Sequence, residues 1–202
     1  MPVWTLTTES DTATQTCGKA LAPLLAAGDV VVLSGDLGAG KTQLTKGLAL
    51  GLGVDEPVTS PTFNILLAHE GRIPLYHFDL YRLEAAEQLD DVDYWATLEA
   101  DGVSVVEWGD RFAESVPEEC VVVRIRITGD DARALQVEPR GARGEVIATS
   151  WTQACSALSG VAVTTGVGTA TGARIASSAG VAPGSTASGA SGASGVGGSE
   201  RS

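Results

Sequence analysis

The sequence predicts an α/β fold, in which a mixed sheet of parallel and antiparallel strands is flanked by helices. Residues 29–34 form a continuous β-branched run, DVVVLS, which is typical of a buried central strand. This run leads directly into a glycine-rich loop, and a helical pattern over 42–52 follows the loop and ends at Gly53. Further short apolar runs recur along the chain up to about residue 138. Strands before and after such a loop, with helices between them, predict a layered α/β domain.

The N-terminal segment adds one strand and one helix to this core. Residues 3–7 alternate between apolar and polar side chains, as a short strand does. The next segment predicts a helix over 11–27, because its apolar side chains recur at helical spacing and Gly28 offers a stop.

Two strands and a helical segment are expected after the glycine loop and its helix. The strands cover 62–68 and 74–78, and a turn at Glu70-Gly71 joins them, so we expect them to pair in an antiparallel arrangement. Residues 85–98 are polar and acidic with scattered apolar side chains, which predicts one or two helices.

Three more strands complete the predicted sheet. Residues 103–106 are a short apolar strand that ends at Glu107. Residues 120–128 alternate clearly in their second half, and 134–138 can pair with them as a hairpin.

The composition of the chain changes abruptly near Ala154, which divides its 202 residues into two parts. We expect a folded domain over 1–154 and a disordered tail over 155–202. The tail consists almost entirely of Ala, Gly, Ser, Thr and Val and contains no aromatic residue. Such a composition buries too little apolar surface to offset the entropy of ordering. A small second domain is the less favoured alternative.

The formal net charge of −12 argues against direct binding of nucleic acid, because the chain repels phosphate backbones. A protein partner is easier to accommodate. The first residues lack a basic start and a long apolar stretch, and no apolar run reaches the length of a membrane span. We therefore expect a cytoplasmic protein without a membrane association.

Residues 35–42, GDLGAGKT, fit the phosphate-loop pattern G-x-x-x-x-G-K-[ST] without a mismatch. In a strand-loop-helix setting, this predicts a P-loop NTPase-like sheet. Lys41 supplies a positive charge for the phosphates, and Thr42 offers a hydroxyl to Mg²⁺. The remaining loop residues are expected to present backbone N–H groups to the phosphate oxygens at the positive end of the helix: Gly35, Asp36, Leu37, Gly38, Ala39 and Gly40.

The chain contains one asparagine, Asn64, and it is followed by Ile65-Leu66. The Asn-Lys-x-Asp element with which many GTP-binding switch proteins hold guanine is therefore missing. This favours ATP over GTP as the nucleotide.

Two carboxylates follow apolar strands and are candidates for the metal and for catalysis. Asp79 comes after LYHF and Glu107 after VSVV. Ligands of α/β sheets bind at such strand ends, so one carboxylate can hold the metal while the other orients the attacking water. Position alone does not assign the two roles. His77 is either a packed strand residue or a hydrogen-bond partner of this catalytic end, whereas His69 is expected in a solvated turn.

The segment Ser60-Pro61-Thr62 follows the phosphate-loop helix at the distance where nucleotide switches place a loop that senses the terminal phosphate. A hydroxyl of Ser60 or Thr62 there could contact phosphate or metal. An ordinary turn into the next strand is an equal alternative.

Taken in series, GDLGAGKT, VTSPTF, YHFDLYRL and VEW resemble the TsaE family, also called YjeE, in order and spacing. The resemblance runs from about Trp4 to about Pro139. It implies an ATPase, weak alone and stimulated by partners, that assists synthesis of threonylcarbamoyladenosine on tRNA. The implied partner is a TsaB-TsaD pair, which carries most of the tRNA contact.

The resemblance also implies roles for single residues. Lys41 and Thr42 serve the phosphates and Mg²⁺, Glu107 is the Mg²⁺ ligand, and Asp79 is the acid related to hydrolysis. The same resemblance places three further residues near the nucleotide: Ser60, Thr62 and Trp108.

Two other function classes remain open from the sequence. A small-molecule kinase could use the same loop, but such kinases close an arginine-rich lid over the phosphate. Here the arginines are dispersed, and no lid-sized insertion separates the strands. A scaffold that binds nucleotide without hydrolysis is disfavoured by the presence of both Asp79 and Glu107.

Overall fold

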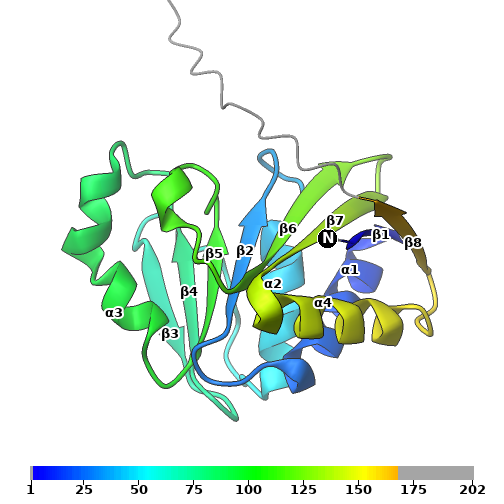
Figure 1. The fold of residues 1–202 in the computed structure, drawn as a ribbon, viewed down its shortest axis with the longest axis horizontal. Helices are drawn as coiled ribbons and strands as arrows, with labels where there is room; N and C mark the ends of the chain where they lie inside the picture. Colours follow the sequence, from blue (N-terminus) through cyan, green and yellow to red (C-terminus); the bar gives the residue numbers. More distant parts are fainter. Residues whose placement is uncertain (1, 168–202) are drawn as a thin grey trace, which may run out of the picture. The chain divides into compact units, whose positions relative to one another are not determined.

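The computed structural model describes residues 2–167, which form an α/β layer structure around an eight-stranded sheet (Figure 1). The helices and strands in chain order are β1 (Pro2–Thr8), α1 (Asp11–Leu21), η1 (Ala22–Leu24), β2 (Val30–Ser34), α2 (Lys41–Leu52), β3 (Leu66–His69), β4 (Leu75–Asp79), η2 (Ala86–Val92), α3 (Tyr94–Leu98), β5 (Val103–Glu107), η3 (Ala113–Ser115), β6 (Cys120–Ile127), β7 (Arg133–Arg140), α4 (Gly141–Cys155) and β8 (Val161–Val167), where η marks a 3₁₀ turn. Within these residues, no helix is both long and apolar enough to cross a membrane.

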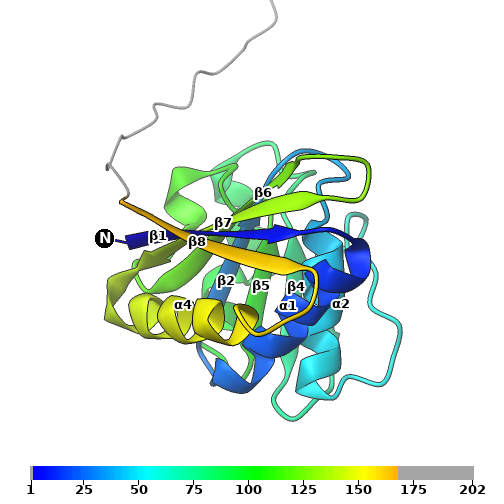
Figure 2. The same cartoon turned by 90° about the vertical axis from the view of Figure 1, so that its right-hand side faces the viewer.

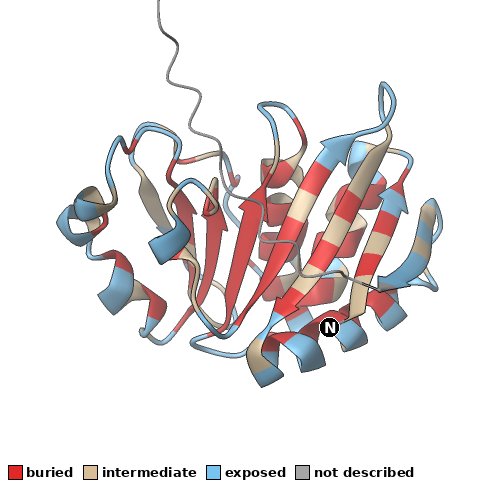
Figure 3. Cartoon of the chain, turned by 45° about the horizontal axis from the view of Figure 1, so that its top comes forward, coloured by how far each residue is buried: buried red, intermediate tan, exposed pale blue. Residues whose placement is uncertain are grey.

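The sheet has the order β3-β4-β5-β2-β6-β7-β1-β8 and mixes the two kinds of pairing. The centre is parallel, because β5 pairs in parallel with both β4 and β2, and β2 pairs in parallel with β6. The outer pairs are antiparallel, including the predicted β3-β4 and β6-β7 hairpins. Figure 3 shows that the central strands are buried on both faces, which explains why their sequences read as unbroken apolar runs. The predicted fold class is confirmed.

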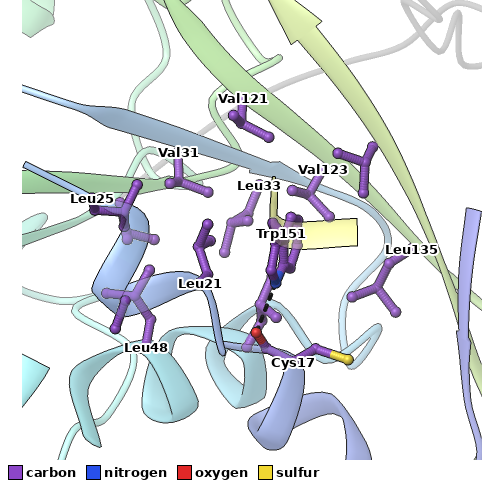
Figure 4. Close-up of a cluster of buried hydrophobic side chains, with 14 of the residues drawn as sticks. Cys17, Leu21, Leu25, Val31, Leu33, Leu48, Val121, Val123, Leu135 and Trp151 are labelled. Atoms are coloured by element: carbon purple, nitrogen blue, oxygen red, sulfur yellow. Dashed lines mark hydrogen bonds between the residues drawn. The ribbon is translucent and has the colours of Figure 1, made fainter. Parts of the chain in front are cut away.

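Side chains that alternate along β2 enter two separate cores. Val31 and Leu33 belong to a cluster that also holds side chains of α1, α2 and α4. Figure 4 shows part of this cluster, with Trp151 of α4 beside the sheet. Val30 and Val32 point to the opposite face, where they join side chains of η2 and α3. Because successive side chains of a strand point to opposite faces of the sheet, one apolar run contributes to both cores.

Helices α1 and α2 cross at glycines. A Cβ atom on Gly18 would lie 2.2 Å from the carbonyl oxygen of Leu44, and one on Gly47 would lie 1.9 Å from the carbonyl oxygen of Gln15. No real Cβ atom tolerates these distances, so only glycine permits this approach of the two backbones. The crossing fixes α2, and with it the phosphate loop, against the N-terminal helix.

Two predicted elements are shorter than expected. The helix predicted over 11–27 ends at Leu21 and continues as the 3₁₀ turn η1, which contains Pro23. Proline cannot donate the hydrogen bond that would extend an α-helix. The strand predicted over 62–68 begins at Leu66, because the N–H groups of Asn64 and Ile65 both donate to the Pro61 carbonyl and form a turn.

The expectation for His69 was also wrong. This residue ends β3 and is buried, and its Nδ1 lies 2.6 Å from Glu56 Oε1. In the antiparallel register, residue 69 pairs with Leu75, on the covered face of the sheet rather than in the solvated turn.

The predicted boundary between domain and tail at residue 154 needs correction. Residues 141–155 form α4, and residues 161–167 form β8, which pairs with β1 along its whole length (Figure 2). A strand that pairs through its backbone needs no aromatic side chain, and Leu158, Val161 and Val163 still pack against the core. The rest of the predicted tail, 168–202, lies outside the described residues.

Candidate functional site

A cleft of about 370 Å³ opens where β2, β4 and β5 reach their carboxyl ends. In parallel α/β sheets this edge is where ligands bind. The residues that line the cleft are Asp11, Leu37, Gly38, Gly40, Lys41, Thr42, Gln43, Lys46, Ser60, Thr62, Asp79, Tyr81, Glu107, Trp108 and Arg133. The structure therefore brings together side chains from all four motifs that the sequence analysis singled out.

The phosphate loop joins β2 to α2 in a conformation that requires glycine. Gly35, Gly38 and Gly40 all have positive φ, and a Cβ atom on Gly35 would lie 2.2 Å from the carbonyl oxygen of Ile125. Helix α2 begins at Lys41, and the preceding Gly40 has no side chain to cap it, whereas Ser10 caps α1 by accepting from the N–H of Ala13. The first turn of α2 thus keeps N–H donors and the positive end of the helix dipole available for an anion.

Lys41 folds back over this loop. Its Nζ donates to the carbonyl oxygens of Gly35 at 2.7 Å and Asp36 at 3.0 Å. Burial lowers the pKa of the Lys41 ammonium, and the nearby carboxylates of Glu107 and Asp79 oppose that shift. A buried ammonium at the mouth of a helix is well placed to neutralise phosphate.

Thr42 and Glu107 meet across the cleft. The hydroxyl of Thr42 lies 2.9 Å from Glu107 Oε1 and 3.1 Å from Oε2. The same oxygen, Oε1, also lies 2.9 Å from His77 Nε2. Both Glu107 and His77 are buried. Of the two alternatives for His77, the structure shows a hydrogen-bond partner of Glu107.

Asp79 lies beside Glu107, because these two residues are register partners on β4 and β5. Its Oδ2 lies 2.7 Å from the Ser60 hydroxyl and 2.8 Å from that of Thr62, and its Oδ1 accepts from the N–H of Tyr81 at 3.0 Å. The two hydroxyls are also 2.7 Å apart. Ser60, Thr62 and Asp79 thus make three mutual contacts, but the two hydroxyls have only two hydrogens to donate. One hydroxyl can therefore turn toward a new acceptor while the other keeps its bond to Asp79.

Trp108 follows Glu107 in a strained conformation, with a φ of 59°. Its ring centroid lies 3.8 Å from Lys41 Nζ and 5.0 Å from the ring of Tyr81. The face of the indole therefore meets the ammonium of Lys41 and stabilises its charge.

The oxygen atoms of Thr42 and Glu107 are suitable ligands for a small, hard cation. The hydroxyl of Thr42 and the carboxylate of Glu107 are the oxygen ligands that Mg²⁺ prefers, with water and phosphate completing its shell. In the part of the chain that the structure describes, no three His, Cys, Asp or Glu side chains gather as a metal site of their own. The pair therefore suits a metal that arrives together with a phosphate ligand.

The sequence analysis missed five residues that line the cleft. Two of them could have been found from the helix predicted after the loop. Lys46 lies one turn beyond Thr42 on α2, and Gln43 follows Thr42 directly. Gln43 Nε2 donates to Asp11 Oδ2 at 2.7 Å and so ties α2 to the start of α1. The other three missed residues are Asp11, Tyr81 and Arg133, the last of which donates from Nε to the carbonyl oxygen of Ala39 at 3.0 Å.

The fold and the site together define a P-loop NTPase-like α/β protein. The sequence model of the family described as "Threonylcarbamoyl adenosine biosynthesis protein TsaE" matches residues 8–135. The chain belongs to the TsaE family.

Several curated proteins are similar to the chain over this region, and all three that follow are named "tRNA threonylcarbamoyladenosine biosynthesis protein TsaE". The protein of Treponema pallidum (strain Nichols) is 46% identical over 120 residues, which cover 59% of this chain and 89% of that protein. The Bacillus subtilis (strain 168) protein is 42% identical over 134 residues, covering 64% and 84%. The Streptomyces coelicolor protein is 49% identical over 120 residues, covering 57% and 80%.

A solved structure supports the same fold. The crystal structure titled for YdiB of Bacillus subtilis matches with a TM-score of 0.64 at 34% sequence identity. The match covers 76% of this chain and 97% of that chain.

Proposed function

We propose that this protein binds ATP with Mg²⁺ in the cleft and hydrolyses it as an accessory to threonylcarbamoyladenosine modification of tRNA. The observation that carries the proposal is the arrangement around α2 in a chain of the TsaE family. An uncapped helix start, the Lys41 ammonium and the Thr42-Glu107 pair converge on one cleft of about 370 Å³.

Each group has a chemical task in this proposal. The loop N–H groups and Lys41 bind the phosphates, while Thr42 and Glu107 hold Mg²⁺. The bound metal neutralises the charge that develops on the phosphate oxygens. Asp79 orients the water that attacks the terminal phosphate, and its contact with Ser60 and Thr62 lets that loop respond to the nucleotide.

The rest of the proposal concerns partners. The names of the similar proteins point to tRNA threonylcarbamoyladenosine synthesis, and the net charge of −12 disfavours unaided contact with tRNA. We therefore assign the tRNA contact mainly to a TsaB-TsaD-like pair, with this protein supplying ATP-driven turnover to that pair. The only asparagine in the chain, Asn64, is not part of an Asn-Lys-x-Asp element, which supports ATP rather than GTP as the nucleotide.

Phosphate release tests the proposal directly. We would measure it with and without a TsaB-TsaD pair, for the wild type and for Lys41→Ala, Asp79→Ala and Glu107→Ala. The pair should stimulate the wild type and none of the variants. Lys41→Ala should also weaken ATP binding by about 10- to 100-fold, since a charge-assisted hydrogen bond contributes roughly 1.5–3 kcal/mol.

Lys19→Ala is the matched control, because Lys19 is exposed on α1 and does not line the cleft. It should behave as the wild type. A wild-type protein that neither binds the pair nor releases phosphate in its presence would refute the proposal. Transfer of the phosphate to a metabolite instead of water would indicate a kinase.

A further inference from the structure

A buried histidine, His77, contacts the carboxylate of Glu107, the residue that the proposed function assigns to Mg²⁺. His77 lies on β4 with no exposed surface, and its Nε2 is 2.9 Å from Glu107 Oε1. The register explains the contact. His77 is opposite Val105 on β5, so Glu107, two residues further along, projects on the same face as its diagonal neighbour.

The direction of this hydrogen bond follows from the acceptor. A carboxylate offers only lone pairs, so the ring hydrogen between the two groups belongs to Nε2 of His77. The other ring nitrogen, Nδ1, has no hydrogen-bond partner among residues 2–167 although it is buried. The single strong polar contact of this side chain is therefore the one with Glu107. This hydrogen bond is directional, so it restricts the orientation of the Glu107 carboxylate, which packing alone would not do.

Glu107 has two donors in the structure, and only one of them is independent of the metal. The Thr42 hydroxyl donates to the carboxylate, but the same hydroxyl is a proposed ligand of Mg²⁺. The bond from His77 reaches the same oxygen, Oε1, and His77 is not among the residues that line the cleft. His77 can therefore fix the side chain of Glu107 whether or not the cation is bound.

We infer that His77 is a positioning residue, which holds the Glu107 carboxylate in the orientation that binds Mg²⁺ beside Thr42. The inference rests on the proposed function, since it concerns the cation that accompanies ATP. Outer-shell hydrogen bonds of this kind orient metal ligands, and their loss commonly weakens metal binding by about 10- to 100-fold.

The test is the strengthening of nucleotide binding by Mg²⁺, measured without turnover. The affinity for a non-hydrolysable ATP analogue is determined once in EDTA and once at saturating Mg²⁺, and the ratio reports the contribution of the metal. In His77→Leu this ratio should fall by about 10- to 100-fold while the affinity in EDTA stays at the wild-type value. A purely structural role would instead lower the melting temperature and leave the ratio unchanged.

Two amide variants test the inference even if His77→Leu does not fold. In His77→Gln, the amide nitrogen can reach the place of Nε2, so the Mg²⁺ ratio should return close to the wild-type value. In His77→Asn, the amide is one carbon shorter and its nitrogen lies near the place of Nδ1, so the ratio should remain low.

His69→Leu is the matched control. His69 is also buried on this face, with its ring centroid 6.3 Å from that of His77, but it contacts Glu56 rather than Glu107. Its Mg²⁺ ratio should equal that of the wild type. If the wild type binds no ATP analogue under either condition, the proposed function fails. If Mg²⁺ strengthens binding equally in the wild type, His77→Leu and His77→Asn, or not at all in the wild type, the inference about His77 is overturned.

Discussion

Trp151 illustrates how much a single side chain contributes outside the cleft. It is fully buried between α4, α1 and the sheet, and its Nε1 donates to the carbonyl oxygen of Cys17 at 2.8 Å (Figure 4). The indole thus combines a large apolar surface with one directional bond. Because α4 covers β6 and β7 at this point, Trp151 anchors the last helix of the described chain.

Two substitutions separate the packing of Trp151 from its hydrogen bond. Trp151→Ala should lower the free energy of unfolding by about 3–5 kcal/mol, because it leaves a cavity. Trp151→Phe keeps most of the ring volume and should cost about 1–3 kcal/mol, because it removes the hydrogen bond to Cys17 and part of the indole. Denaturant unfolding measures both, with the exposed Val146→Ala on the same helix as a control that changes stability by at most about 0.5 kcal/mol. Equal losses in the two Trp151 variants would contradict the dominance of packing.

The cleft residues that could be predicted from sequence lie in short contiguous motifs. Lys41 and Thr42 stand in a fixed pattern, and Asp79 and Glu107 follow recognisable strands, so their meeting at one sheet edge follows from parallel pairing. Arg133 could not be found in this way. Its contact with Ala39, 94 positions earlier in the chain, depends on the register of the β6-β7 hairpin, which no local pattern specifies.

The crossing of α1 and α2 is the clearest feature at the scale of elements. Alanine normally stabilises a helix relative to glycine by about 1 kcal/mol. At Gly47, however, a Cβ atom would meet the backbone of Gln15 at 1.9 Å. We expect Gly47→Ala to lower the melting temperature despite its better helix propensity, because the helices must separate. Gly129→Ala is the control, since its Cβ meets nothing closer than 3.4 Å.

The helix crossing also predicts an effect on ATP binding. Since α2 carries Lys41 and Thr42 in its first turn, Gly47→Ala should weaken ATP binding as well as stability. Calorimetric melting and nucleotide titration measure the two effects. A variant that melts above the wild type would show that the crossing is not as tight as the distances indicate.

Element prediction failed where the buried face carries small residues. Helix α4 buries Gly144, Ile147, Ala148, Trp151 and Cys155, a spacing that follows the helical period. Glycine and alanine contribute little to an apolar pattern, so the sequence analysis placed 141–154 in the folded domain but predicted no helix there. The strands of the parallel centre were predicted well for the opposite reason, since burial on both faces leaves continuous runs of valine.

At the scale of the whole molecule, β8 tests where the folded unit ends. A chain ending at Val167 keeps every described contact and should melt at the temperature of the full-length protein. A chain ending at Cys155 loses β8 and the contacts of Leu158, Val161 and Val163 with the core. Its melting temperature should fall by roughly 4–12 °C, because burial of these side chains contributes about 2–3 kcal/mol and a domain of this size shifts about 2–4 °C per kcal/mol. Equal melting temperatures for the two truncations would mean that β8 adds nothing to stability.

The position of β1 between β7 and β8 sets the order in which the sheet can be completed. Trp4 pairs with Val137 on one side and Thr165 on the other, so β1 pairs only with strands that come much later in the described chain. Closing such long loops is entropically costly and slows folding. The parallel centre that carries the phosphate loop does not depend on this step, because β4, β5, β2 and β6 pair among themselves. We therefore expect the half of the sheet that would bind ATP to form without β1, and β1 to join the sheet only after β7 and β8 have been made.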